Sequence, residues 1–316
     1  MKRAIYLLGL LLLLSLNGCS RNKPEPGSYV IGFYNLENLF DTLHDEGKND
    51  EAFLPDGINE WTEDKYLVKQ RNMATVIDAM RDENDAWHAV LGVGEVENLH
   101  VLEDLVAQPE IAPAGFRIVH YEGPDRRGID VALLYRKDRF RVAGVDSLRI
   151  PSVTTRDILY VKLAEQTDLL HVFVVHLPSK RGGARASDDR RAAALSVLEH
   201  AVDSLLQADS RQRIVVMGDF NDTDCTVQGL SAVPNDTLPY AFPRVPGSLK
   251  YHGRWEQIDH FFVSPAVDAV MRIFAAPFLL EPDKTWLGVK PRRTYIGPRY
   301  NGGLSDHLPV ILQISQ

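Results

Sequence analysis

In residues 214–222, IVVMGDFND, an apolar run is followed by a glycine and then by two carboxylates and an amide. A short apolar run that ends at a glycine is typical of a buried strand leaving its sheet. Asp219 and Asn221 therefore stand at the end of a predicted strand. Polar groups in this position either hold a turn or face a cation, and the rest of the chain must decide between these two roles.

The same pattern recurs at the ends of other predicted strands. An apolar run over residues 29–34 is followed by NLEN, and a run over residues 88–94 is followed by EVEN. A carboxylate also follows Ile258, and an acid–histidine pair precedes the last apolar run of the chain. The polar residues at these strand ends are Asn35 and Glu37, Glu95, Asp219 and Asn221, Asp259, and Asp306 with His307.

Polar groups at successive strand ends converge when the strands share a sheet or belong to facing sheets. Four or five converging carboxylates would repel one another strongly without a cation. A hard divalent ion such as Mg²⁺, held by carboxylates and water, resolves that conflict. A zinc site would need more histidine and cysteine ligands than this arrangement offers.

Each of these residues also has a structural explanation. Asp219 could cap a turn, Glu37 could belong to a turn over residues 35–38, and the Asp306-His307 pair could be exposed. His176, at the end of the apolar run 170–176, could be a hydrogen-bonded histidine near the core. Glu97 and Asn98 are interpreted as a helix start with Asn98 as the N-cap, which leaves Glu95 as the ligand candidate. Five such coincidences in one chain favour a shared site.

The elements that must position these residues follow from apolar periodicity. Residues 63–81 and 187–206 are predicted helices, and residues 98–107 also have a helical pattern. Strands are predicted over residues 29–34, 88–94, 116–120, 131–135, 140–150, 159–162, 170–176, 214–218, 258–263 and 308–314. Strands that first follow one another and later alternate with helices predict a layered α/β fold with sheets inside and helices outside. No linker interrupts residues 28–316, so one domain is expected there.

The N-terminus has the features of an export signal. Lys2 and Arg3 precede an apolar stretch that is too short for a membrane span. The stretch ends in residues 16–19, LNGC, which resemble the lipobox of bacterial lipoproteins. Residues 1–18 are therefore expected to be removed, Cys19 to carry the lipid, and residues 19–27 to form a flexible tether. An exported protein anchored to a bacterial membrane by this lipid, on the periplasmic or cell-surface side, is expected.

Composition narrows the class of protein further. The chain has 316 residues, is 45% hydrophobic and has a formal net charge of −8. These values are ordinary for a globular protein and give no sequence-wide basic surface for nucleic acid. After Cys19 only Cys225 remains, so no disulfide within the mature chain is expected. We expect a monomer.

The motifs together resemble the endonuclease/exonuclease/phosphatase superfamily, which is DNase I-like. The segments that carry the resemblance run from Asn35 to His307: NLEN, GEVEN, RGIDVALLYR, VVHLPSKRGG, GDFND, QIDHFFV and SDHLPV. The resemblance implies a four-layer α/β sandwich, in which two central mixed β-sheets are flanked by α-helices. It also implies a Mg²⁺-dependent phosphoesterase, with Mn²⁺ as a substitute ion.

The resemblance also implies roles for individual residues. Glu95 would be the principal Mg²⁺ ligand, with Asn35 beside it and Glu37 and Asp306 near the ion. Asp219 would orient or deprotonate the attacking water, and Asn221 would hold that water or a phosphate oxygen. His307 would contact the scissile phosphate, with its ring oriented by Asp259. His176 would also contact the phosphate, and Asp130 is a candidate for orienting the His176 ring.

The substrate is less well defined by the sequence. Basic residues follow His176 at Lys180, Arg181 and Arg185, and others precede Ser305. They could bind a nucleic-acid backbone or a phosphorylated headgroup, or they could form a solvated face with structural ion pairs. Nucleic acid and a nuclease-like phosphodiesterase are the leading interpretation. The alternatives are a phosphomonoesterase on inositol phosphates, sugar phosphates or lipid headgroups, and a lipoprotein that keeps the fold only for binding.

Overall fold

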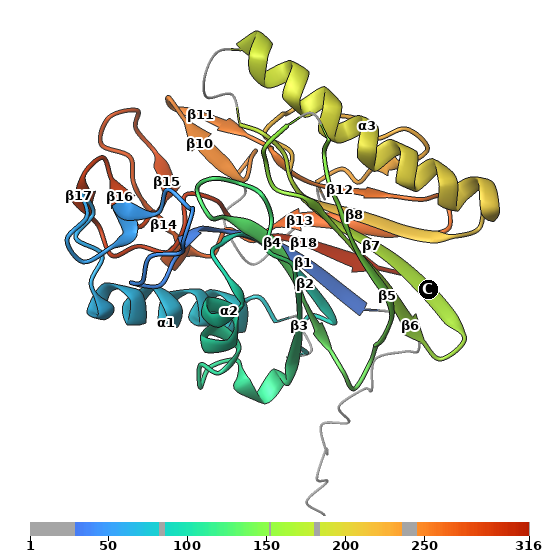
Figure 1. The fold of residues 1–316 in the computed structure, drawn as a ribbon, viewed down its shortest axis with the longest axis horizontal. Helices are drawn as coiled ribbons and strands as arrows, with labels where there is room; N and C mark the ends of the chain where they lie inside the picture. The colour runs from blue at the N-terminus through green and yellow to red at the C-terminus, as the bar shows by residue number, and fades with distance from the viewer. Residues whose placement is uncertain (1–28, 82–85, 152, 180–183, 236–244, 316) are drawn as a thin grey trace, which may run out of the picture.

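Two six-stranded mixed β-sheets form the centre of the computed structural model, and α-helices lie on their outer faces (Figure 1). The structure describes residues 29–81, 86–151, 153–179, 184–235 and 245–315. The predicted signal segment, Cys19 and the predicted tether therefore lie outside the described residues. The helices are α1 (Glu63–Ala79), α2 (Leu99–Val106) and α3 (Ala184–Ala208), with 3₁₀ turns at Glu51–Phe53, Ala112–Ala114 and Pro277–Leu279.

The first sheet has the order β13-β18-β1-β2-β4-β3. Its central pair, β1 and β2, is parallel, and the other pairs are antiparallel. These strands are β1 (Tyr29–Leu39), β2 (Val90–Val96), β3 (Phe116–His120), β4 (Asp130–Arg136), β13 (Ala269–Ile273) and β18 (Val310–Ile314).

The second sheet has the order β5-β6-β7-β8-β12-β9, and its central pair, β7 and β8, is again parallel. Its strands are β5 (Arg141–Leu148), β6 (Ile158–Glu165), β7 (Asp168–His176), β8 (Arg213–Asp219), β9 (Ser231–Ala232) and β12 (Asp259–Val263). Three small hairpins pair β10 (Leu249–Tyr251) with β11 (Arg254–Glu256), β14 (Leu280–Pro282) with β15 (Val289–Pro291), and β16 (Tyr295–Ile296) with β17 (Arg299–Tyr300).

The two sheets pack face to face through apolar side chains. Gly92 of β2 lies so close to Met217 of β8 that an added Cβ would come within 2.8 Å of the methionine Cε. Along β7, Val172 and Val174 belong to this inner core, whereas the alternating residues Phe173 and Val175 face outwards. Because side chains alternate along a strand, these central strands need apolar residues on both faces.

The outward-facing residues of the second sheet are covered by α3. Ala194, Leu198 and Val202 of this helix pack with Val175 and Val216 of the sheet. In Figure 1 α3 lies along one outer side of the molecule, and α1 and α2 lie on the opposite side. The expected four-layer α/β sandwich with two central mixed sheets is thus confirmed. None of the helices in the described residues is long and apolar enough to span a membrane.

The boundaries of the elements differ from the predicted ones where local sequence was a poor guide. Strand β1 was expected to end at Tyr34 but continues through NLEN to Leu39, with a register shift against β2 between Asn35 and Leu39. Strand β13 and the short hairpins had no clear pattern and were not predicted. The predicted N-cap is confirmed, since the Asn98 side chain accepts a hydrogen bond from the Val101 amide at 3.1 Å.

Candidate active site

The strand ends bring the predicted site residues to one edge of the two sheets. In the first sheet Asn35 of β1 pairs in register with Gly94, next to Glu95 at the end of β2. In the second sheet Asp219 at the end of β8 lies in register with both His176 of β7 and Asp259 of β12. The convergence expected from the sequence is therefore observed, and residues from both sheets contribute to it.

Asp219 lies at the centre of this group and is buried. The Asn35 amide Nδ2 donates a hydrogen bond to Asp219 Oδ2 at 3.2 Å, and the Asn221 backbone amide donates to Oδ1 at 2.8 Å. His176 Nε2 and His307 Nε2 lie 3.5 and 3.8 Å from Oδ2. Burial raises the pKa of Asp219 to about 7, although the charge of His307 opposes that rise.

His307 and Asp259 form a buried pair. Nδ1 of His307 lies 2.8 Å from Asp259 Oδ2, and the His307 backbone amide donates to the Ser305 hydroxyl at 3.1 Å. Burial by itself lowers the pKa of His307, but Asp259 and the neighbouring Asp219 together raise it well above the usual value. His307 is therefore held as an imidazolium in a fixed orientation.

His176 has the opposite electrostatic character. Burial, followed by the positive charges of Arg156 and Arg127, lowers its pKa well below the usual value, so its ring is neutral. Nε2 faces Asp219 and lies 3.8 Å from Glu95 Oε1, whereas Nδ1 is buried without a hydrogen-bond partner among the described residues.

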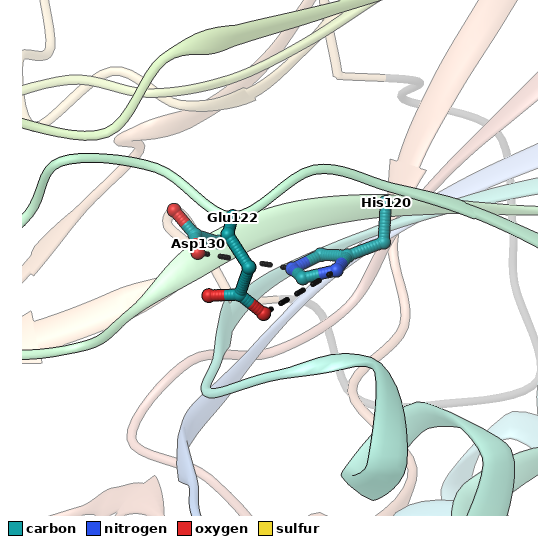
Figure 2. A group of neighbouring side chains, drawn as sticks. All are labelled: His120, Glu122 and Asp130. Carbon is teal, nitrogen blue, oxygen red and sulfur yellow. Dashed lines mark ion pairs between the residues drawn. The ribbon is translucent and has the colours of Figure 1, made fainter. Parts of the chain in front are cut away.

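The predicted pairing of Asp130 with His176 is wrong. Asp130 begins β4, and its Oδ2 accepts a hydrogen bond from the Gly123 amide at 3.0 Å and lies 3.7 Å from His120 Nε2. Figure 2 shows the Asp130 carboxylate directed at the His120 ring. The side chain is held on the side of its strand that faces the 121–129 loop, and a strand-end position in the sequence does not reveal this.

Glu95, the principal predicted metal ligand, is partly open to solvent, with 16% of its side chain exposed. Its Oε2 accepts a hydrogen bond from the Asn38 amide at 3.0 Å. Glu37, Asn38, Glu95 and Asn221 all adopt left-handed backbone angles, with φ between 51° and 59°. Such angles are uncommon for residues other than glycine and gather at functional sites. These residues are therefore held in place by the surrounding tertiary contacts.

Glu37 and Asp306 are joined through a cation that the motifs did not assign. Arg293 Nε donates to Glu37 Oε1 at 3.1 Å, and its Nη2 donates to Asp306 Oδ2 at 2.9 Å. Beneath them the buried Lys69 of α1 donates to Thr294 Oγ1 and to the Leu304 carbonyl oxygen. Burial lowers the pKa of Lys69 to about 8, and the carboxylates of Glu37 and Asp306 oppose that fall. The positive charges of Arg293 and Lys69 thus offset the negative charges of Glu37 and Asp306.

The predicted basic loops are only partly described. Lys180 and Arg181 lie outside the described residues, and Arg185 belongs to the first turns of α3. Before Ser305, Lys290 pairs with Glu281 at 3.4 Å, and Arg293 pairs with Glu37 and Asp306 as above. Structural ion pairs therefore account for part of the basic cluster that precedes Ser305.

Comparison of the sequence with known protein families identifies the family of this chain. The sequence profile of the Endonuclease/Exonuclease/phosphatase family matches residues 30–316, which include all of the strand-end residues of the site. The chain belongs to this family. Since these enzymes hydrolyse phosphoester bonds, the chain is a phosphoesterase of the endonuclease/exonuclease/phosphatase type.

Solved structures with low sequence identity share the fold. Truncated TDP2 from Caenorhabditis elegans is 14% identical, with 92% of this chain and 98% of that chain covered and a TM-score of 0.58. A mannosyl-6-phosphatase from Bacteroides thetaiotaomicron is 17% identical, with 92% and 100% covered and a TM-score of 0.56. An endonuclease/exonuclease/phosphatase family protein from the same species is 16% identical, with 92% and 98% covered and a TM-score of 0.55. No curated protein matches the chain.

In this family member, Arg156 is a site residue that sequence reasoning missed. It is buried and donates to the backbone carbonyl oxygens of His176 and Leu177 at 3.0 and 2.7 Å, and to Asp125 at 3.0 Å. The Asn221 amide donates to the same Leu177 oxygen at 2.9 Å. Arg156 thereby holds the end of β7 beside the strand that carries Asp219. Lys69 was missed for a similar reason, because a cation inside a helical pattern carries no motif.

Replacing Arg156 by methionine should lower the free energy of unfolding by about 3–5 kcal/mol. The change removes the buried partner of Asp125, which keeps only the half-exposed Arg127 at 3.4 Å, and it leaves the carbonyl oxygens of His176 and Leu177 without this donor. Urea denaturation would measure this loss. Arg149→Met is the matched control, since this exposed arginine pairs with Asp157 at 3.1 Å and such a pair contributes at most about 1 kcal/mol. Equal losses in the two variants would show that Arg156 does not hold the end of β7.

Proposed function

We propose that this family member is a Mg²⁺-dependent phosphoester hydrolase that acts on phosphodiesters in the manner of a nuclease. The observation that carries the proposal is the balance of charge around Asp219. When all are ionised, five carboxylates converge there, whereas the described residues supply three cations, which leaves two negative charges. Without an ion, burial raises the pKa of Glu37 and of Asp219 to about 7 instead. The carboxylates belong to Glu37, Glu95, Asp219, Asp259 and Asp306, and the cations are Lys69, Arg293 and the His307 imidazolium.

One divalent cation would neutralise this remainder, and the available donors suit a hard ion. Among the described residues no cationic side chain is bonded to Glu95, whose partly exposed carboxylate follows Gly94, the residue that pairs in register with Asn35. Carboxylate and amide oxygens are the protein ligands that Mg²⁺ prefers. We therefore assign Glu95 and Asn35 as the residues that hold the ion, with Glu37 and Asp306 close by. Mn²⁺ uses the same ligand types and is expected to substitute.

When bound, Mg²⁺ supplies positive charge to the phosphoryl oxygens of the substrate. The chain's own residues then position the other participants. Asp219, oriented by Asn35 and Asn221, accepts a proton from the attacking water, and a pKa near neutrality suits this role. The His307 imidazolium, oriented by Asp259, donates a hydrogen bond to a phosphoryl oxygen. The neutral His176, whose Nε2 also faces Asp219 Oδ2, is assigned a second contact with the phosphate.

The role of Arg293 leads to a prediction about the number of ions. If Arg293 takes the place of a second cation in the active site, Arg293→Met should bind one Mn²⁺ ion more per chain than the wild type. Calorimetric titration of Mn²⁺ into metal-free protein would measure both numbers. Arg292→Met is the matched control, because its side chain is exposed and its loss should leave the number of bound ions unchanged. Equal numbers in Arg293→Met and the wild type would mean that this guanidinium does not exclude a second ion.

A phosphomonoesterase is the second candidate function. It is favoured by the shared fold with a structure named as a mannosyl-6-phosphatase. Fold similarity at this identity does not decide between substrates, because substrate selection depends on the loops around the site.

The experiment that separates these functions measures hydrolysis with Mg²⁺ and with EDTA by protein that begins near Pro24. Its substrates are plasmid DNA, RNA, bis-p-nitrophenyl phosphate, p-nitrophenyl phosphate, inositol polyphosphates, mannose 6-phosphate and sphingomyelin. EDTA-sensitive cleavage of nucleic acid or of the diester is the expected result. Cleavage of monoesters alone would support the phosphatase, and no cleavage would favour a binding lipoprotein.

We further propose that the protein is exported and carries a lipid on Cys19. The apolar segment behind Lys2 and Arg3 and the LNGC sequence support this proposal. In a bacterial host the full chain should incorporate labelled fatty acid and fractionate with membranes, and Cys19→Ala should abolish the label. Equal labelling of the two proteins would contradict lipidation at Cys19.

A further inference from the structure

A second group of metal-ligating side chains lies on the outer strands of the first sheet. His120 ends β3, Asp130 begins the adjacent β4, and Glu122 lies in the loop between them. One ligand atom from each of the three residues lies within 4.8 Å of the other two. Figure 2 shows both carboxylates directed toward the imidazole ring of His120.

The His120 ring is buried without a hydrogen-bond partner for Nε2. Its side chain is 3% exposed, and Nε2 has no partner among the described residues. Nε2 lies 3.7 Å from Asp130 Oδ2, and Nδ1 lies 3.9 Å from Glu122 Oε1. Both distances are too long for a hydrogen bond. A buried polar atom without a hydrogen-bond partner lowers the stability of the folded state, and binding of a ligand at Nε2 would remove this cost.

The distance between Nε2 and Asp130 Oδ2 suits two ligands of one metal ion. Zinc binds nitrogen and oxygen ligands at about 2.0–2.2 Å, which separates two ligands of a tetrahedral site by roughly 3.3–3.7 Å. Glu122 and solvent water would supply the remaining ligands.

The loop between the two strands is held in place before any ion binds. The Gly123 amide donates to Asp130 Oδ2, and Lys48 Nζ donates to the carbonyl oxygens of Gly123 and Asp125 at 2.9 and 3.2 Å. Glu122 is thereby kept next to His120, while 53% of its side chain remains exposed. Its Oε1 faces Nδ1, so this half-exposed side chain has to turn to reach an ion held by Nε2 and Asp130.

We infer that His120, Glu122 and Asp130 form a second metal site, distinct from the candidate active site, which binds a divalent transition metal such as Zn²⁺. An imidazole nitrogen with two carboxylates suits Zn²⁺ better than Mg²⁺, which prefers oxygen ligands alone. The site joins the end of β3 to the start of β4. It also anchors the loop in which Asp125 pairs with Arg156, the arginine that holds the His176 backbone.

The test uses Zn²⁺ titration of protein in which Glu95→Gln removes the proposed Mg²⁺ ligand and Asp219→Asn removes a carboxylate from the group of Asp219, Asp259 and His307, which could also hold an ion. This background protein is expected to bind one Zn²⁺ per chain, with an affinity that millimolar Mg²⁺ does not change. Adding His120→Gln should weaken binding by about 100-fold or more, since it removes the only nitrogen ligand. His100→Gln is the matched control, because this exposed histidine of α2 also lies near a carboxylate, at 3.7 Å from Asp104.

Zn²⁺ binding by Glu122→Gln provides a second test in case His120→Gln does not fold. Glu122→Gln changes a half-exposed side chain, should fold, and should weaken Zn²⁺ binding by about tenfold or more. Zn²⁺ should also raise the melting temperature of the background protein and not that of the ligand variants. Absence of Zn²⁺ binding in the background protein would overturn the inference. Binding that survives both His120→Gln and Glu122→Gln would overturn it as well.

Discussion

Asp219→Asn is expected to lower the hydrolysis rate by about 10³-fold under saturating Mg²⁺. Asparagine keeps the size of the side chain and can still accept one hydrogen bond, but it cannot accept a proton from water. General-base catalysis contributes about 10²–10⁴-fold in enzymes, so the loss should fall within this range. The rate constant kcat, measured on the best substrate of the panel, should carry the loss, with a smaller change in KM.

Asp222→Asn provides the matched control for this substitution. Asp222 lies three residues further along the same segment, and it contacts Arg191 at 3.8 Å rather than the site. Its substitution should leave kcat within about twofold of the wild type. A full rate in Asp219→Asn would falsify the assignment of Asp219 and, with it, the proposed arrangement of the site.

Asp219→Asn should also change how the stability of the metal-free protein depends on pH. The folded-state pKa of Asp219 is raised to about 7, whereas an unfolded aspartate titrates near about 3.9. The folded state therefore binds more protons between these values, so stability is lost as the pH rises from about 4 to about 7. The asparagine of the variant has no carboxyl group to ionise, so the variant does not lose this stability. It should therefore melt at a higher temperature than the wild type at about pH 8 without metal. Added Mg²⁺ should narrow the difference.

His307→Gln is the second substitution with a large expected effect. It removes a buried positive charge beside the reacting phosphate, and removal of one preorganised donor costs about 10²–10³-fold in kcat. It also leaves Asp259 without its imidazolium partner, so the folded state should lose about 3–5 kcal/mol. Rates must therefore be expressed per folded molecule, with the folded fraction measured by circular dichroism.

Two further variants separate the charge of His307 from its orientation. Asp259→Asn keeps the ring but removes the carboxylate that orients it at 2.8 Å, so a loss smaller than that of His307→Gln is expected. His260→Gln changes the neighbouring histidine, whose Nε2 contacts the Asp222 carbonyl oxygen at 2.9 Å, and should leave kcat unchanged. If His307→Gln kept the wild-type kcat, the imidazolium would have no part in the reaction.

The site could be predicted from the sequence wherever a strand and its polar end lie together in the chain. Asp219, Asn221, Glu95 and Asn35 each follow an apolar run, and strands in shared or facing sheets bring such ends together. The N-cap at Asn98 was predictable for the same reason, since a cap depends on residues three positions apart. These features depend on residues that are close together in the chain, so the sequence alone is enough to predict them.

Contacts between distant segments could not be predicted in this way. Arg293 lies 256 residues from Glu37, and Lys69 lies 225 residues from Thr294, yet both pairs are in direct contact. The partner of Asp130 was mistaken because a strand-end position does not say which neighbouring side chain a carboxylate meets. Likewise the first strand was expected to end at Tyr34, whereas the left-handed residues of NLEN continue β1 with a hydrogen bond from Asn38 to Glu95.

The sequence by itself therefore determined the class of fold, the edge at which the site lies and the strand-end residues that meet there. Only the tertiary structure decided the charge state of the site. Asp219 and His176 are moved toward neutrality by burial, and His307 is kept charged by the carboxylates packed against it. Burial and the distances between charges depend on packing across both sheets, and residue type and spacing do not contain this information.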